Sequence, residues 1–135
     1  MQGNLAYKMG INSYQQIESK TLSPRQTEAR VLRKAAQKLR DCQENWDLGD
    51  RRKRLEEAFE YNQRIWTIFQ SELTQPDHPM DKTLRQNLLN LSIFIEKQIF
   101  DVRAYGYSDP EKLTSIININ SGLAAGLSKT VSAVQ

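Results

Sequence analysis

The stretch LEEAFEYNQRIWTIFQSEL, residues 55–73, decides the fold of this chain. Its large apolar residues recur at helical spacing and share one helix face: Leu55, Phe59, Trp66, Phe69 and Leu73. Asn62 points from the middle of that same face. Because a buried amide is costly unless it forms hydrogen bonds, the sequence predicts that Asn62 ties this helix to a packed neighbour.

Start signals bracket another helix before this stretch, over about residues 23–45. Ser23 is the predicted N-cap, Pro24 suits the first helical position, and Gln26 stands where a capping-box partner belongs. The predicted buried stripe is narrow and contains mostly small side chains: Ala29, Leu32, Ala35, Ala36, Leu39 and Cys42. Gly49 and Asp50 then break the pattern, so the helix that contains residues 55–73 is predicted to begin at about residue 50.

A third helix, predicted over about residues 81–104, is apolar on two sides. One seam is made of Leu84, Leu88, Leu91, Ile95, Ile99 and Val102. Nearly opposite lie Leu89, Ile93 and Phe100. Two apolar faces predict either the central helix of a bundle or a helix that leaves one face for a partner.

A fourth helix is predicted to start near Ser108, with Glu111 as its capping-box partner and Asp109 directly before Pro110. Its apolar stripe contains an asparagine, as the second helix does: Leu113, Ile116, Ile117, Asn120, Leu123, Ala124 and Leu127. Gly122 and Gly126 each weaken a helix by about 1 kcal/mol relative to alanine, so the last turns are expected to depend on contacts.

These elements predict an all-α protein, a small antiparallel bundle of about four helices with an extended N-terminal strap. We assign residues 1–22 to the strap, 23–128 to a single helical-bundle domain and 129–135 to a tail. A chain of 135 residues is long enough to bury a core without disulfides or a metal. The single cysteine, Cys42, is predicted to be a small buried residue in a reducing compartment, and we expect a cytoplasmic protein because no secretory signal or membrane span is visible.

The residues needed for catalysis are scarce in this sequence. It has one histidine, one cysteine and no glycine-rich phosphate loop, so we predict neither an enzyme nor a metal or other cofactor. The net charge is +3, and basic residues crowd the start of the second helix: Arg51, Arg52, Lys53 and Arg54. This basic cluster is interpreted either as solvated surface or as a set of RNA phosphate contacts.

Three groups of residues, in their order and spacing, resemble the FlaF family of flagellar biosynthesis regulators of alphaproteobacteria. They are Tyr14 followed by SPRQTE at 23–28, NQRIW at 62–66, and Asn120 with Gly126 and Leu127. The likeness covers roughly residues 11–128. Nine of the residues that carry it are interpreted as architecture: Tyr14, Ser23, Pro24, Glu28, Asn62, Arg64, Trp66, Asn120 and Gly126. Glu28 lies on the apolar arc of its helix and needs a polar partner, for which Arg64 is a candidate.

The resemblance implies a cytoplasmic regulator that binds flagellin as a chaperone or adaptor. It implies that such a protein acts with a second regulator, FlbT, and couples flagellin synthesis to secretion and filament assembly. We predict a partner-facing surface on the third and fourth helices: Leu89, Ile93, Phe100, Ile116, Leu123 and Leu127. One alternative is an RNA-binding regulator of flagellin messenger that uses the basic cluster. Another is a structural module that dimerises through its low-charge end.

Overall fold

The computed structural model describes residues 24–134, and the side chains of residues 25–128. Within these residues the fold is all-helical, as predicted, with four α-helices, one short 3-10 turn and no strand. The helices are α3 (Pro24–Glu44), α4 (Arg51–Leu73), α5 (Lys82–Ala104) and α6 (Thr114–Val134), and the 3-10 turn is η1 (Pro110–Leu113). The predicted strap at 1–22, Tyr14 and the Ser23 cap lie outside the described residues.

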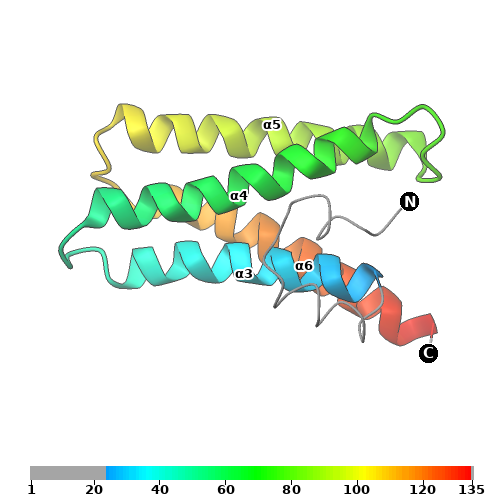
Figure 1. Cartoon of the computed structure of the whole chain (residues 1–135), viewed down its shortest axis with the longest axis horizontal. Helices are drawn as coiled ribbons and strands as arrows, with labels where there is room; N and C mark the ends of the chain where they lie inside the picture. The colour runs from blue at the N-terminus through cyan, green and yellow to red at the C-terminus, as the bar shows by residue number, and fades with distance from the viewer. Residues whose placement is uncertain (1–23, 135) are drawn as a thin grey trace.

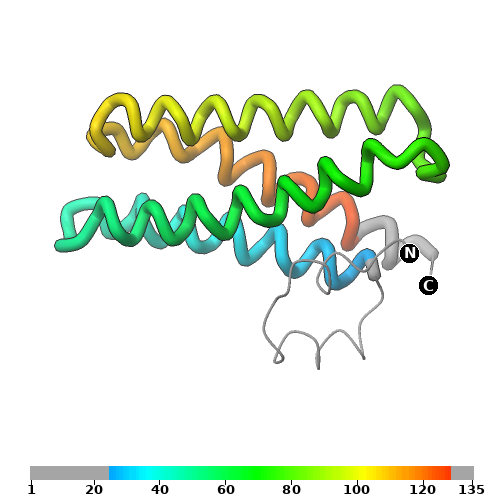
Figure 2. Tube along the Cα trace, turned by 45° about the horizontal axis from the view of Figure 1, so that its top comes forward, coloured from blue at the N-terminus to red at the C-terminus, as the bar shows by residue number. Residues whose placement is uncertain are grey.

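The helices α3, α4 and α5 run side by side, with α4 in the middle of the row, and α6 crosses behind them (Figure 1). The later half of α6 lies along α3, as the second view confirms (Figure 2), and α3 packs against both α4 and α6. The predicted alternative of α5 as the central helix is therefore wrong. The small side chains of α3 let two helices approach it, whereas α5 packs mainly against α4.

The core forms where these helices meet, and the predicted stripes supply it. All six predicted positions of α3 are buried, and Val31 and Thr27 join them. From α4 the core takes Leu55, Phe59, Ile65 and Trp66, and Trp66 meets the half-buried Phe69 edge to face at 5.4 Å. Cys42 is buried, as predicted.

A hydrogen-bonded network crosses the middle of this core. Asn62 is fully buried and donates to the backbone oxygens of Ala35 at 3.3 Å and Ala58 at 2.9 Å. Asn120 of α6 donates to the Oδ1 atom of Asn62 at 2.6 Å and accepts from Trp66 Nε1 at 2.9 Å. The predicted role of Asn62 is confirmed, because its amide joins α3, α4 and α6.

The loops follow local backbone chemistry. Asp50, rather than Gly49, takes the left-handed conformation before α4, with φ of 61°. After α5 the N–H groups of Gly106 and Tyr107 donate to the oxygens of Arg103 and Val102, a Schellman motif in which Gly106 has φ of +69°. This motif turns the chain toward α4 and fixes where Tyr107 lies.

The start of the last helical segment differs in detail from the prediction. Asp109, not Ser108, is the capping residue, since its side chain accepts from the Glu111 N–H at 3.0 Å. Ser108 instead donates to the Tyr105 oxygen at 2.7 Å. A 3-10 turn comes first and the α-helix begins at Thr114, and its backbone continues through the predicted tail to Val134. None of the described helices combines the length and apolar character that crossing a membrane requires.

Candidate partner-binding surface

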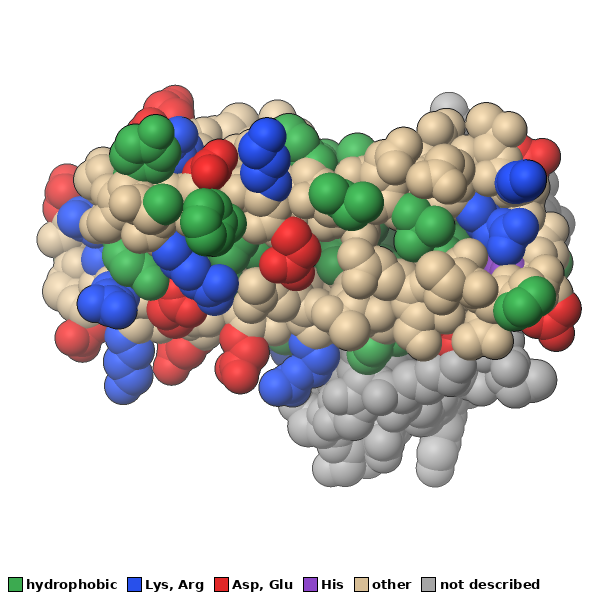
Figure 3. Space-filling view, turned by 90° about the horizontal axis from the view of Figure 1, so that it is seen from above, with side chains coloured by type: hydrophobic (Ala, Val, Ile, Leu, Met, Phe, Trp, Pro, Cys, Tyr) green, Lys and Arg blue, Asp and Glu red, His purple; other side chains and the backbone are tan. Residues whose placement is uncertain are grey.

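Large apolar side chains are exposed along α5. Ile93 is 62% exposed and Phe100 is 67% exposed, although side chains of this kind are usually covered. The two lie seven residues apart and so share one helix face, together with the half-buried Leu89. We call Leu89, Ile93 and Phe100 the outer face of α5. Figure 3 shows hydrophobic side chains distributed over this side of the molecule.

The outer face is free because α5 uses its other side for packing. Ser92, Ile95, Ile99 and Val102 are buried, and no described element covers the opposite side. Leu84 and Phe94 are also exposed, at 48% and 39%, away from the outer face. The sequence prediction that one side of this helix remains available therefore agrees with the burial of its residues.

The predicted surface residues of α6 are placed differently. Ile116 is fully buried in the core, so its assignment to a partner-facing surface is wrong for the folded chain. Leu123 and Leu127 are half-buried and pack against the core cluster. They lie on the later half of α6, along α3 and apart from α5 (Figures 1 and 2), so the structure does not bring them to the outer face.

Two members of the basic cluster hold the loop before α4. Arg54 donates to the backbone oxygens of Asn45, Leu48 and Gly49 at 2.8 to 3.2 Å. Arg51 donates to the Trp46 oxygen at 3.1 Å and its guanidinium lies 4.8 Å from the centre of the Trp46 ring. Of the four basic residues, Arg52 and Lys53 are exposed and the other two are half-buried, which leaves a smaller phosphate-binding surface than the sequence indicates.

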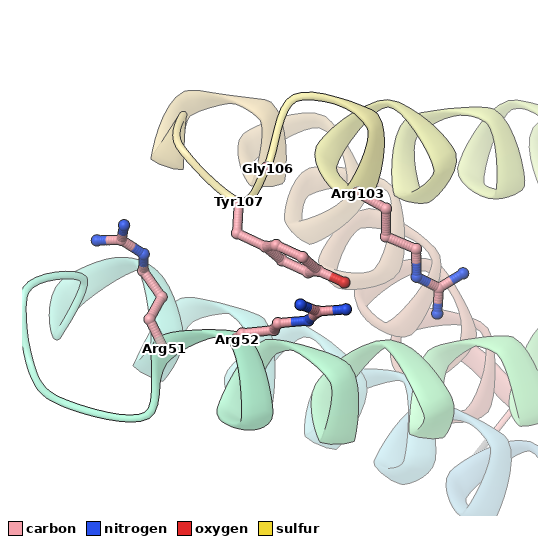
Figure 4. A pocket seen from close by; sticks show the side chains of 5 residues that line it. All are labelled: Arg51, Arg52, Arg103, Gly106 and Tyr107. Atoms are coloured by element: carbon pink, nitrogen blue, oxygen red, sulfur yellow. The ribbon is translucent and has the colours of Figure 1, made fainter.

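The structure also brings together an arginine pocket that the sequence analysis missed. It is an open pocket of about 590 Å³ between the start of α4 and the loop after α5, lined by Arg51, Arg52, Arg103, Gly106 and Tyr107. In Figure 4 the Tyr107 ring lies across the pocket, with Arg52 beneath it and Arg103 at its far side. In the sequence, the glycine between two tyrosines at 105–107 indicates a turn. It does not indicate that this turn faces α4.

One carboxylate organises this region. Glu56 accepts two hydrogen bonds from Arg103, at 2.8 and 2.9 Å, and one from the Tyr107 hydroxyl at 2.6 Å. The hydrogen bonds from Arg103, which have the largest effect, and the one from Tyr107 hold the pKa of Glu56 below its ordinary value. The same contact raises the pKa of Tyr107, since its hydroxyl donates to a carboxylate. Because Glu56 fixes Arg103 and Tyr107, it gives the arginine pocket its shape.

The remaining predicted architectural residues have varied surroundings. Burial raises the pKa of Glu28 to about 7, with Arg25 opposing the shift and Glu72 adding to it. Arg64 is exposed and lies 3.9 Å from Glu60, so the suggested pairing of Glu28 with Arg64 is wrong. Pro24 begins α3, as predicted. Gly126 lies within α6, and a Cβ atom there would meet nothing within 4 Å.

Comparison with known protein families gives a match over residues 10–127, to the family described as flagellar protein FlaF. The chain belongs to the FlaF family. The match spans the anchors at Tyr14, Asn62 and Asn120, so the sequence resemblance is confirmed. Neither the search of curated proteins nor the search of solved structures gives a match to this FlaF-family chain.

Proposed function

We propose that this FlaF-family protein binds flagellin in the cytoplasm as a chaperone or adaptor that couples flagellin synthesis to secretion and filament assembly. The proposal rests on membership of a flagellar family and on one structural observation. Ile93 and Phe100 lie on the same exposed face of a well-packed helix, at 62% and 67% exposure. An exposed apolar helix face is a typical binding site for an amphipathic helix of a partner.

The outer face of α5 suits a helical partner on physical grounds. Its anchors recur at helical spacing, so they present a straight apolar ridge rather than a scattered set of side chains. A partner helix can bury that ridge without any rearrangement of the core, because α5 is already fixed by Ile95 and Ile99. The second regulator, FlbT, would then act on the same complex, either beside flagellin or by promoting its binding.

Size-exclusion chromatography of the intact chain with purified flagellin, with and without FlbT, tests the proposal. We expect a stoichiometric complex at micromolar concentration. The double substitution Ile93→Ser and Phe100→Ser should abolish it, because both anchors are lost while the core is untouched. Leu84→Ser is the matched control, since Leu84 is an exposed apolar residue of the same helix on another side. A flagellin complex that survives the double substitution would contradict this docking surface.

A second candidate, an RNA-binding regulator of flagellin messenger, is supported by the exposed side chains of Arg52 and Lys53 at the start of α4. It predicts binding to flagellin messenger that falls steeply with salt. A mobility-shift assay at two salt concentrations, with Arg52→Gln and Lys53→Gln, measures this. Binding that is indifferent to salt and to both substitutions would remove these residues as an RNA site. The dimer alternative is tested by the mass of the chain in solution.

A further inference from the structure

The arginine pocket lies next to the outer face of α5. Phe100 and Arg103 are three residues apart on the same helix, so they are neighbours across one helical turn. Tyr107 and Gly106 follow in the turn that ends α5, and Arg52 approaches from the first turn of α4. Figure 3 shows hydrophobic, basic and acidic side chains intermixed at the end of the molecule where α5 finishes. A helix laid along Ile93 and Phe100 would reach this pocket with one of its ends.

The pocket carries more positive than negative charge. Three arginines line it, although the Arg51 guanidinium is hydrogen-bonded to Trp46 and points away from Tyr107 in Figure 4. Glu56 is the carboxylate that bonds to Arg103. Within the described part of the chain, neither Arg51 nor Arg52 forms a salt bridge with a carboxylate, although the charge of Arg52 helps to lower the pKa of Glu56. Arg52 is exposed and is held over the Tyr107 ring at 5.3 Å, so its guanidinium is already oriented. A group that enters the pocket therefore meets fixed positive charge.

From this arrangement we propose that the arginine pocket binds a carboxylate at one end of the partner helix that docks on the outer face of α5. This inference rests on the proposed function and adds to it the direction in which the partner helix runs. Guanidinium groups bind carboxylates through paired, planar hydrogen bonds, as Arg103 already does with Glu56. The apolar ridge supplies binding area and the arginine pocket fixes which way the partner helix runs.

The aromatic rings of this region favour a protein carboxylate over RNA. Unpaired bases are bound by stacking on free aromatic faces. Here Arg52 lies over Tyr107, Lys112 lies 4.8 Å from the centre of the Tyr105 ring, and Arg51 lies over Trp46. A cation thus lies over each of these rings, which reduces the surface available for a base. A carboxylate does not need a free ring face, because it binds the N–H groups at the edge of a guanidinium.

The affinity of full-length flagellin for variants at two adjacent basic residues tests this inference. Arg52 lines the pocket, whereas its exposed neighbour Lys53 is not among the lining residues, so equal charge changes at the two sites form matched pairs. We expect Arg52→Gln to weaken flagellin binding about threefold and Arg52→Glu about tenfold. The affinity of the Arg52→Gln variant should also depend less on salt concentration than that of the unmodified chain. Lys53→Gln and Lys53→Glu should change affinity by less than about twofold. Circular dichroism of each variant checks that the fold is unchanged.

The outcomes separate this inference from the proposed function. If Arg52→Glu binds flagellin as Lys53→Glu does, while the Ile93 and Phe100 double variant does not bind, the pocket inference fails and the docking surface stands. If the unmodified chain binds no flagellin with or without FlbT, both fail. If Arg52→Glu leaves flagellin binding unchanged but weakens binding to flagellin messenger RNA, the pocket binds phosphate, and the carboxylate assignment is overturned.

Discussion

Asn120 donates a hydrogen bond of 2.6 Å to Asn62 between two side chains that are both fully buried, 58 residues apart in sequence. The bond joins α6 to α4, and Trp66 extends the connection through its own bond to Asn120. Satisfied polar groups in an apolar core restrict how helices can pack, because every alternative register leaves a donor without an acceptor. We infer that these asparagines fix the register of α6 against α4.

Replacing Asn120 with alanine should therefore destabilise the fold by about 2 to 3 kcal/mol, because the buried Trp66 N–H loses its acceptor and Asn62 loses a donor. Urea unfolding followed by circular dichroism measures this. Asn118→Ala is the matched control, since Asn118 is exposed on the same helix, and it should change stability by about 0.5 kcal/mol or less. Equal effects of the two substitutions would show that the network contributes nothing specific.

Glu56→Gln should lower stability by about 1 kcal/mol at neutral pH, because the ion pair with Arg103 is half-exposed and partly screened. The pKa of Glu56 is lowered by folding, so its contribution is present above the unfolded pKa and is lost as pH falls. The difference between variant and unmodified chain should thus shrink below about pH 4. Glu57→Gln, at the exposed neighbouring position, should have little effect at any pH. Identical pH profiles would contradict this role.

Glu28→Gln is expected to stabilise the protein at high pH. Burial raises the pKa of Glu28 from 4.5 to about 7, so the unfolded chain loses this proton before the folded chain does as pH rises. Stability therefore falls between about pH 4.5 and pH 7 and stays lower above that range. The substitution should recover up to about 3 kcal/mol at pH 8 and almost nothing at pH 4. Glu44→Gln, exposed on the same helix, serves as the control. A loss of stability at pH 8 would refute the prediction.

Cys42 should react slowly with a thiol reagent in the folded protein. Its side chain is buried, and burial raises the pKa of its thiol, so both access and the thiolate fraction are reduced. Labelling with Ellman's reagent at pH 8 should be slower by about tenfold or more than in denaturing urea. As the chain has one cysteine, the signal has a single source. Equal rates in both conditions would mean that this part of α3 opens readily.

Much of the fold could be predicted from local pattern. The boundaries of α3, α4 and α5 lie within one residue of the predicted ones, because proline, aspartate and glycine act on the backbone next to them. The buried stripe of α3 and the polar role of Asn62 follow from helical spacing alone. The start of the last helix was less accurate, since Ser108 and Asp109 both fit a cap and only local geometry selects Asp109.

The candidate site was predicted in part. Ile93 and Phe100 could be identified because they lie opposite the packed seam of α5, but Ile116 could not be distinguished from a surface residue by its spacing. The arginine pocket was missed because Arg52 and Arg103 lie far apart in sequence. They meet only once the turn at Gly106 places Tyr107 against α4.

The sequence by itself determined which residues form helices and which sides of those helices are apolar, since both depend on interactions among residues a few positions apart. Tertiary structure decided which apolar sides become core and which remain exposed. It packed α3 rather than α5 against both α4 and α6, left Ile93 and Phe100 uncovered, and brought Arg52 beside Tyr107. Each of these results depends on which helices pack together, and that choice is made by contacts between residues distant in the chain.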